Sequence, residues 1–149
     1  MSEQETLHVR PFGYVEPYPV VCEVDDASVF IGNVHATTAR SFDAVLSLTE
    51  KRQPETTHYH PLVDGPETDW PEFAAAVDET RAFLAEAGSL LVHCKAGVSR
   101  SAAVLATALA VEQEEPFLAG LDRVQAARPV AVPHPALHEL GVVYLAARS

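Results

Sequence analysis

The segment from His93 to Ser101, with the sequence HCKAGVSRS, constrains this chain more than any other. An apolar run over residues 90–92 precedes it, and an apolar stretch over residues 102–111 follows it. This order predicts a buried strand, a tight loop and a buried helix. A loop in that place turns its backbone N–H groups and the N-terminus of the helix toward one point, which makes a binding site for an anion.

The chemistry of this loop depends on Cys94 and Arg100, which lie six positions apart with Gly97 between them. A cysteine at the bottom of an anion site is held as the thiolate, which is the reactive form. The planar guanidinium of Arg100 can hold two phosphate oxygens. A nucleophile inside a loop shaped for phosphate indicates phosphoryl transfer through a cysteinyl-phosphate.

The string from His93 to Ser101 resembles the signature loop of the cysteine-dependent protein tyrosine phosphatases, and most of all that of their dual-specificity subgroup. The similarity continues outside the loop, in residues 59–64 (YHPLVD) and in the run Arg128-Pro129 with Pro133. The resemblance implies a single α/β domain with a mostly parallel central sheet and helices on both faces. In the family an asparagine follows the second proline and helps to brace the loop, whereas this chain has His134 there.

The resemblance also implies a role for each loop residue. Cys94 is the expected nucleophile, and the hydroxyl of Ser101 is expected to assist breakdown of the phosphoenzyme. His93 is expected to hydrogen-bond the loop and to help hold the thiolate. Lys95 either enlarges the positive field at the mouth of the loop or is a solvated side chain. The expected substrate-binding residues are Lys95, Ala96, Gly97, Val98, Ser99 and Arg100.

A phosphatase of this type needs a general acid, because the leaving oxygen takes up a proton as the P–O bond breaks. Asp64 is the candidate, 30 residues before Cys94 and at the end of the segment that resembles the family's acid segment. The rival is Asp69. Its position before a helical pattern, with Glu72 three residues later, predicts a capping box instead.

The remaining pattern predicts strands alternating with helices, which is typical of a parallel sheet covered by helices. We expect strands over residues 20–24, 28–31, 42–48, 58–63 and 89–93, and a helical turn over residues 36–41. Longer helices are expected from Asp69 to Gly88, over residues 102–111, from Pro116, and over residues 135–147. The predicted inward faces of the last two helices are Leu118, Leu121 and Val124, and Leu137, Leu140, Val143 and Tyr144.

Length and composition limit the classes of protein to consider. We expect a loose lead-in over residues 1–19 and one catalytic domain over residues 20–149. The net charge of −11 disfavours nucleic acid and anionic membranes as partners. No targeting segment or membrane span is expected, so the predicted location is cytoplasmic. The acidity fits either a salt-adapted source or an ordinary acidic protein, and the sequence does not fix the oligomeric state.

No cofactor and no metal are expected. His58, His60, His134 and His138 match no tight set of metal ligands. Cys22 and Cys94 are the only cysteines, too few for a disulfide framework. Cys22 is expected to be a small residue packed in a strand, and the alternative is a protective disulfide with Cys94 under oxidation.

The sequence therefore predicts a phosphatase that acts on phosphotyrosine and phosphoserine or phosphothreonine in proteins. A phosphoinositide or RNA 5′-phosphate phosphatase on the same scaffold is the alternative. A rhodanese-like sulfurtransferase and a phosphate-binding module without turnover are the other classes to distinguish.

Overall fold

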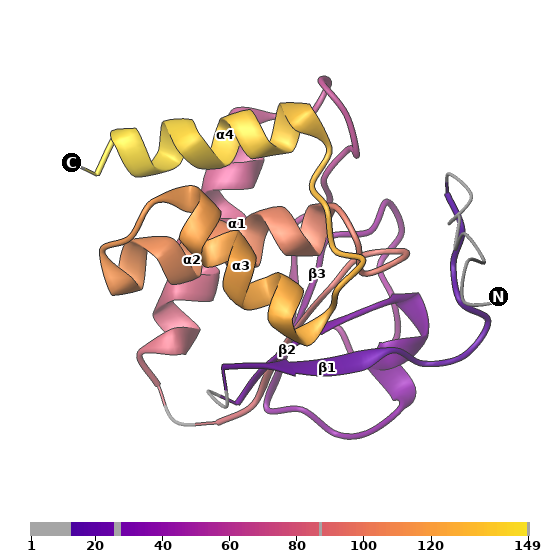
Figure 1. Cartoon of the computed structure of the whole chain (residues 1–149). Coiled ribbons are helices and arrows are strands. Elements are labelled where there is room, and N and C mark those ends of the chain that lie inside the picture. Colours follow the sequence, from indigo (N-terminus) through magenta and orange to yellow (C-terminus); the bar gives the residue numbers. More distant parts are fainter. Residues whose placement is uncertain (1–12, 26–27, 87, 149) are drawn as a thin grey trace, which may run out of the picture.

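The computed structural model describes residues 13–25, 28–86 and 88–148, which form a sheet with helices packed against it (Figure 1). The sheet has five strands in the order β1-β2-β5-β3-β4. All neighbouring strands are parallel except β1 and β2, so the prediction of a mostly parallel sheet is confirmed. The strands are β1 Val21–Val24, β2 Val29–Gly32, β3 Ala44–Ser47, β4 His58–Tyr59 and β5 Leu90–His93.

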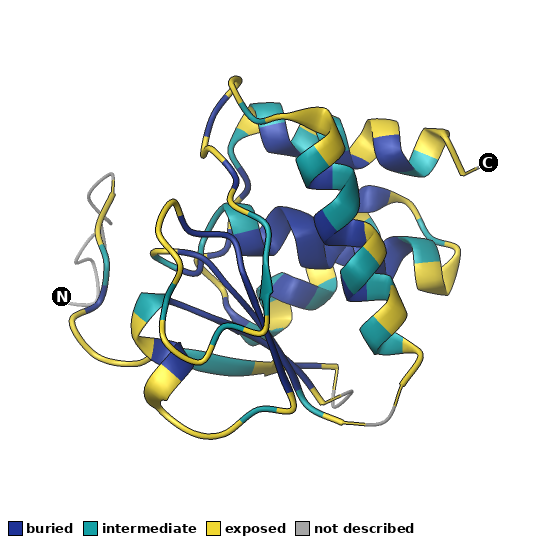
Figure 2. Cartoon of the chain, turned by 180° about the vertical axis from the view of Figure 1, so that it is seen from behind, coloured by how far each residue is buried: buried dark blue, intermediate teal, exposed yellow. Residues whose placement is uncertain are grey.

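Four α-helices and one 3-10 helix make up the helical part of the described chain. The central helix α2 contacts each of the other three α-helices, and every residue from Ser101 to Ala110 is buried (Figures 1 and 2). This confirms the prediction of a helix that is apolar on all sides because it is buried on all sides. The helices are α1 Trp70–Leu84, α2 Arg100–Gln113, α3 Phe117–Ala127, α4 Pro135–Ala146 and the 3-10 helix η2 Val34–Thr38.

The two faces of the sheet are covered unequally. Alternate strand residues face opposite sides, and in β2 the residues Val29 and Ile31 pack in the large core that contains residues of all four α-helices. Phe30, between them, packs in a second, smaller cluster with Ala36 of η2. Helices therefore lie on both faces, as predicted, but η2 is the only helix on the second face within the described part of the chain.

Several predicted details of the helices are wrong. The side chain of Asp69 makes no capping hydrogen bond at the start of α1, and Glu72 bonds His60 instead of the backbone, so there is no capping box. Leu118 and Val143, predicted to face inward, are 60% and 46% exposed. Leu118 lies one position after Phe117, and it is Phe117 that α3 buries.

The fourth predicted strand is shorter than expected because Pro61 has no N–H to donate. The strand β4 ends at Tyr59, although the N–H groups of His60 and Leu62 still donate to the carbonyls of Ser47 and Leu48. The chain thus follows β3 as far as Leu62 and reaches Asp64 at the carboxyl edge of the sheet.

Residues 1–12 of the predicted lead-in lie outside the described residues. Residues 13–19 have no regular secondary structure, but the side-chain amide of Asn33 donates to the carbonyls of Glu16 and Tyr18, and Glu16 is buried. The boundary at residues 19 and 20 stays a prediction.

The parallel strands position the site. Because β2, β3, β4 and β5 run in the same direction, their carboxyl ends share one edge, where open α/β sheets bind ligands. The loop of residues 94–99 follows β5 at this edge, and the segment that ends at Asp64 follows β4. In the described part of the chain, no helix has the length and apolar character needed to cross a membrane.

Candidate active site

The loop of residues 94–99 is held so that its carbonyls point away from its centre. The carbonyl of Lys95 accepts from Val34 N–H at 2.9 Å, and that of Val98 accepts from Val132 N–H at 2.8 Å. The guanidinium of Arg128 donates to the carbonyls of Ala96 and Gly97 at 3.0 and 3.2 Å. Among the described residues, none accepts a hydrogen bond from the N–H groups of residues 95–99. These N–H groups are left to bind an anion.

Gly97 makes the tight curve of this loop possible. Its φ of +70° lies in the left-handed region, which other residues rarely adopt. A Cβ at this position would also lie 2.8 Å from the carbonyl oxygen of Gly32. Both the backbone conformation and the close approach of β2 therefore require glycine here.

The nucleophile candidate Cys94 lies at the base of the loop and is 2% exposed. Its sulfur lies 3.1 Å from the hydroxyl oxygen of Ser101, which is fully buried in the first turn of α2. The structure thus brings Cys94 and Ser101 together as expected, at the N-terminus of a helix whose dipole favours negative charge.

The guanidinium of Arg100 is held by one of its nitrogens. Its Nη1 donates to the carbonyl of Leu62 at 3.2 Å and approaches that of Leu48 at 3.5 Å. Its Nε is buried and has no hydrogen-bond partner among the described residues. A buried, unsatisfied donor is costly in a folded protein. Here it leaves a guanidinium edge for an oxyanion ligand to satisfy.

His93 is fully buried beneath the loop. Its Nδ1 donates to the carbonyl of Cys94 at 3.3 Å, and its Nε2 lies 2.5 Å from the hydroxyl of Ser47. Burial, reinforced by the positive charge of Arg100, lowers the pKa of His93 from 6.5 to about 4. The hydrogen bonds of the ring thus run to the backbone of the loop and to Ser47, not to the sulfur of Cys94.

The candidate acid Asp64 lies across the mouth of the loop. Its Oδ1 accepts a hydrogen bond of 2.5 Å from the hydroxyl of Ser99, whose oxygen accepts from the N–H of His134 at 2.8 Å. Asp64 shares a cavity with Cys94 and Arg100. The rival Asp69 is not among the residues that line this cavity or its neighbour.

Two cavities meet at the loop. The first, of about 620 Å³, contains Cys94 and has an apolar wall of Val15, Val130, Val132 and Pro133. The second, of about 510 Å³, shares Asp64, Lys95 and Arg100 with the first and adds Lys51. The only two lysines of the chain therefore line the same cavity. A larger cavity of about 690 Å³ lies between the C-terminal part of α2 and helices α3 and α4, and it contains none of the predicted site residues.

The sequence did not identify Arg128 as a residue that holds the loop, because there it stands out only as part of an Arg-Pro run that resembles the family. It is 8% exposed, and besides holding the loop it pairs with Glu16 at 3.0 Å. At His134, the position of the family's bracing asparagine, the backbone N–H donates to the hydroxyl of Ser99, and Arg128 braces the loop from another side. Asn33 was also missed; it caps η2, which carries the N–H of Val34 that holds Lys95.

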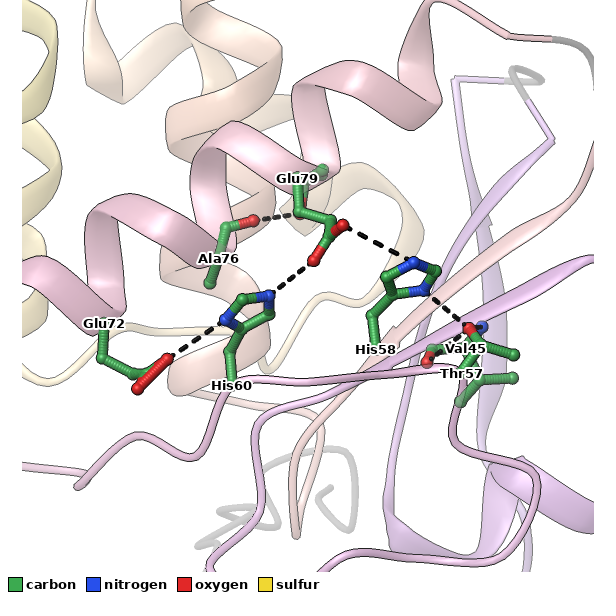
Figure 3. Close-up of polar contacts among 8 residues, drawn as sticks. Val45, Thr57, His58, His60, Glu72, Ala76 and Glu79 are labelled. Carbon is green, nitrogen blue, oxygen red and sulfur yellow. Dashed lines mark hydrogen bonds and ion pairs between the residues drawn. The ribbon is translucent and has the colours of Figure 1, made fainter.

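Two of the histidines form a network with glutamates of α1, not with the site (Figure 3). The ring of His60 lies between Glu72 at 3.1 Å and Glu79 at 2.6 Å, and His58 lies 3.5 Å from Glu79. No group of three or more His, Cys, Asp or Glu in residues 13–25, 28–86 and 88–148 is arranged to hold a metal ion. Cys22 packs against the large core, and burial raises the pKa of its thiol.

Comparison with known proteins places this loop in a family. The chain is 30% identical over 131 residues to dual specificity protein phosphatase MPK-4 of Drosophila melanogaster, covering 78% of this chain and 34% of that protein. It is 35% identical over 82 residues to dual specificity protein phosphatase 19 of Mus musculus, covering 52% of this chain and 36% of that protein. The chain thus spans about a third or less of the length of the curated relatives it matches. No family model matches it.

Solved structures agree with these relatives. The crystal structure of human DUSP28 superposes with a TM-score of 0.76 at 25% identity, covering 88% of this chain and 98% of that one. A mouse putative dual specificity phosphatase, crystallised with zinc tungstate, superposes with a TM-score of 0.74 at 27% identity, covering 92% and 94% of the two chains. With its cysteine loop between β5 and α2, the chain belongs to the dual-specificity phosphatases.

Proposed function

We propose that the chain hydrolyses phosphate monoesters of tyrosine, and of serine or threonine, in proteins through a cysteinyl-phosphate intermediate. The observation that carries the proposal is the position of Cys94 at the base of a loop whose carbonyls are tied outward. Such a loop offers N–H donors where the three equatorial oxygens of a phosphoryl group gather charge in the transition state.

In the first step the thiolate of Cys94 attacks phosphorus in line with the leaving oxygen. The S–P bond forms as the P–O bond breaks, and Asp64 gives its proton to the leaving oxygen. Arg100 holds two phosphoryl oxygens with the edge that carries the unpartnered Nε.

In the second step a water molecule attacks the phosphorus and the S–P bond breaks. Asp64, now a carboxylate, takes the proton of the water. Ser101 donates a hydrogen bond to the departing sulfur, since the two atoms are 3.1 Å apart. The products are inorganic phosphate and the regenerated thiolate.

The apolar wall of the first cavity supports a protein substrate with an aromatic phosphoester. Val130 and Val132 are 40% and 58% exposed beside the loop and can pack against a phosphotyrosine ring. The only lysines near the site are Lys51 and Lys95. Two lysines supply little positive charge to bind a highly phosphorylated inositol ring, so they favour a protein substrate over a phosphoinositide.

A panel assay tests this function. Wild type and Cys94→Ser are compared on phosphotyrosine, phosphoserine and phosphothreonine peptides, with a phosphoinositide, a 5′-triphosphorylated RNA and thiosulfate as alternatives. The proposal expects peptide hydrolysis that Cys94→Ser abolishes, while the variant still binds vanadate because the loop remains. Turnover of thiosulfate alone, or phosphopeptide binding without any release of phosphate, contradicts it.

A further inference from the structure

Ser99 occupies the N-cap position of α2, yet its side chain does not cap the helix. A serine at this position usually accepts a hydrogen bond from an N–H of the first helical turn. Here the hydroxyl is engaged elsewhere, between Asp64 on one side and His134 on the other. The N–H groups of the first turn of α2 therefore stay available to an anion in the loop.

The direction of these two hydrogen bonds is fixed by the chemistry of the partners. The backbone N–H of His134 can only donate, so it donates to the oxygen of Ser99, at 2.8 Å. The single proton of the Ser99 hydroxyl then points to Oδ1 of Asp64, at 2.5 Å. With Oδ1 engaged by this hydrogen bond, Oδ2 is the oxygen of Asp64 left for the transfer of a proton.

The contact joins three segments that the chain brings together only at this edge of the sheet. Asp64 follows the β4 segment, Ser99 ends the cysteine loop, and His134 precedes α4. Asp64 is exposed, so packing does not hold its carboxyl. Within its own loop, Thr68 bonds the carbonyls of Val63 and Gly65 but not the carboxyl. Among the described residues, the only hydrogen-bond partner of that carboxyl is the hydroxyl of Ser99.

We propose that Ser99 is a positioning residue, whose hydroxyl holds the carboxyl of Asp64 so that Oδ2 faces the leaving oxygen of a substrate bound at Cys94. The inference rests on the proposed function, because it assigns Ser99 a part in proton transfer to the leaving group. It separates two uses of one loop, since the N–H groups of residues 95–99 hold the phosphoryl group and the side chain of Ser99 holds the acid.

The experiment compares a substrate that needs the acid with one that needs it little. Phenyl phosphate has a poor leaving group, and p-nitrophenyl phosphate has a good one. Ser99→Ala is expected to lower kcat on phenyl phosphate by about tenfold, the equivalent of one hydrogen bond, and to lower kcat on p-nitrophenyl phosphate by a clearly smaller factor. Ser99→Thr, which keeps the hydroxyl, is expected to restore the lost rate.

Two further variants separate positioning from damage to the loop. Ser89→Ala is the matched control, because Ser89 bonds Asp43 at the opposite end of β5, and it is expected to change neither rate. In an Asp64→Asn background, Ser99→Ala is expected to cost nothing further on phenyl phosphate, since the two residues act together.

The outcomes distinguish this inference from the proposed function. Equal losses on both substrates, or a loss from Ser99→Ala that persists in Asp64→Asn, would overturn the positioning role while leaving the phosphatase intact. If Asp64→Asn has no effect on either substrate, the acid assignment is wrong and the role of Ser99 falls with it.

Discussion

Arg128 and Glu16 form an ion pair of 3.0 Å across 112 positions of the chain, and each side chain is only 10% exposed. The same guanidinium donates to the carbonyls of Ala96 and Gly97 in the cysteine loop. A charge removed from water needs a partner of opposite sign and further hydrogen bonds. Arg128 has Glu16 as the partner of opposite charge and the two loop carbonyls as hydrogen-bond acceptors, and it thereby joins the N-terminal segment to the loop.

Removing Arg128 should therefore destabilise the fold and disturb the loop. Arg128→Met leaves the carboxylate of Glu16 buried without this partner, and the free energy of unfolding is expected to fall by about 3 kcal/mol. The double variant Glu16→Leu with Arg128→Met should lose less, as measured by chemical denaturation. A double variant less stable than Arg128→Met would contradict this account of the pair.

His93 predicts how stability changes with pH. Its pKa is about 4 in the fold, against 6.5 for an unperturbed histidine, so folding favours the neutral ring. As the pH falls from 6.5 to 4, His93 becomes protonated in the unfolded chain but stays neutral in the folded protein. The contribution of His93, up to about 3 kcal/mol, is present above pH 6.5 and is lost over this range.

The titration of His93 can be followed directly by NMR, through the ring protons, with His93→Gln used to assign the signal. A midpoint near 4 is expected. The difference in unfolding free energy between wild type and His93→Gln should also shrink as the pH falls from 7 to 4.5. A midpoint near 6.5 would show that the ring is not held neutral by burial.

Asp64 and Asp69 should give distinct phenotypes. Asp64→Asn is expected to lower kcat on phenyl phosphate by about 10²- to 10⁴-fold, to lower it less on p-nitrophenyl phosphate, and to melt near wild type. Asp69→Ala is expected to change neither the rate nor the melting temperature greatly, because the Asp69 side chain makes no capping bond. Exchanged kinetic phenotypes would transfer the acid role to Asp69.

The excess of acidic residues predicts a response to salt. With 21 acidic against 10 basic residues, repulsion within the fold opposes stability at low ionic strength, and salt screens it. If the protein is adapted to salt, its melting temperature should rise as NaCl increases to molar levels. A flat or falling melting temperature would favour the ordinary acidic protein instead.

The local sequence pattern predicted the strand, loop and helix around Cys94. The short apolar run of residues 90–92 favours a buried strand, Gly97 favours a tight loop, and the longer apolar run of residues 102–111 favours a buried helix. The pattern also predicted the parallel sheet. It failed where the outcome depends on partners distant in sequence. Asp69 and Glu72 have the spacing of a capping box, but His60, twelve residues before Glu72, takes the carboxylate.

Leu121, Val124, Leu137 and Tyr144 are buried as predicted. The prediction of the inward faces failed for a similar reason at two residues that are exposed, Leu118 and Val143. At 3.6 residues per turn, the side chains of Phe117 and Leu118 point about 100° apart, and packing against α2 and α4 decides which of the two is buried. Arg128 lies 31 positions after Gly97 and 32 positions after Ala96, whose carbonyls it holds, so no short motif predicts these contacts. The bond from Ser99 to Asp64 joins residues 35 positions apart, and it too appears only in the folded chain.

The central claim is that phosphate passes through Cys94, and the covalent intermediate tests it most directly. Ser101→Ala removes the hydroxyl 3.1 Å from the sulfur and is expected to slow breakdown of the intermediate about tenfold, since the departing thiolate loses one hydrogen bond. The variant is mixed with ³²P-labelled phosphotyrosine peptide and quenched in acid within milliseconds. The account predicts label bound to protein and mapped by mass spectrometry to Cys94, and none in Ser101→Ala with Cys94→Ser. Release of labelled phosphate at the wild-type rate by Cys94→Ser, or label on another residue, would contradict it.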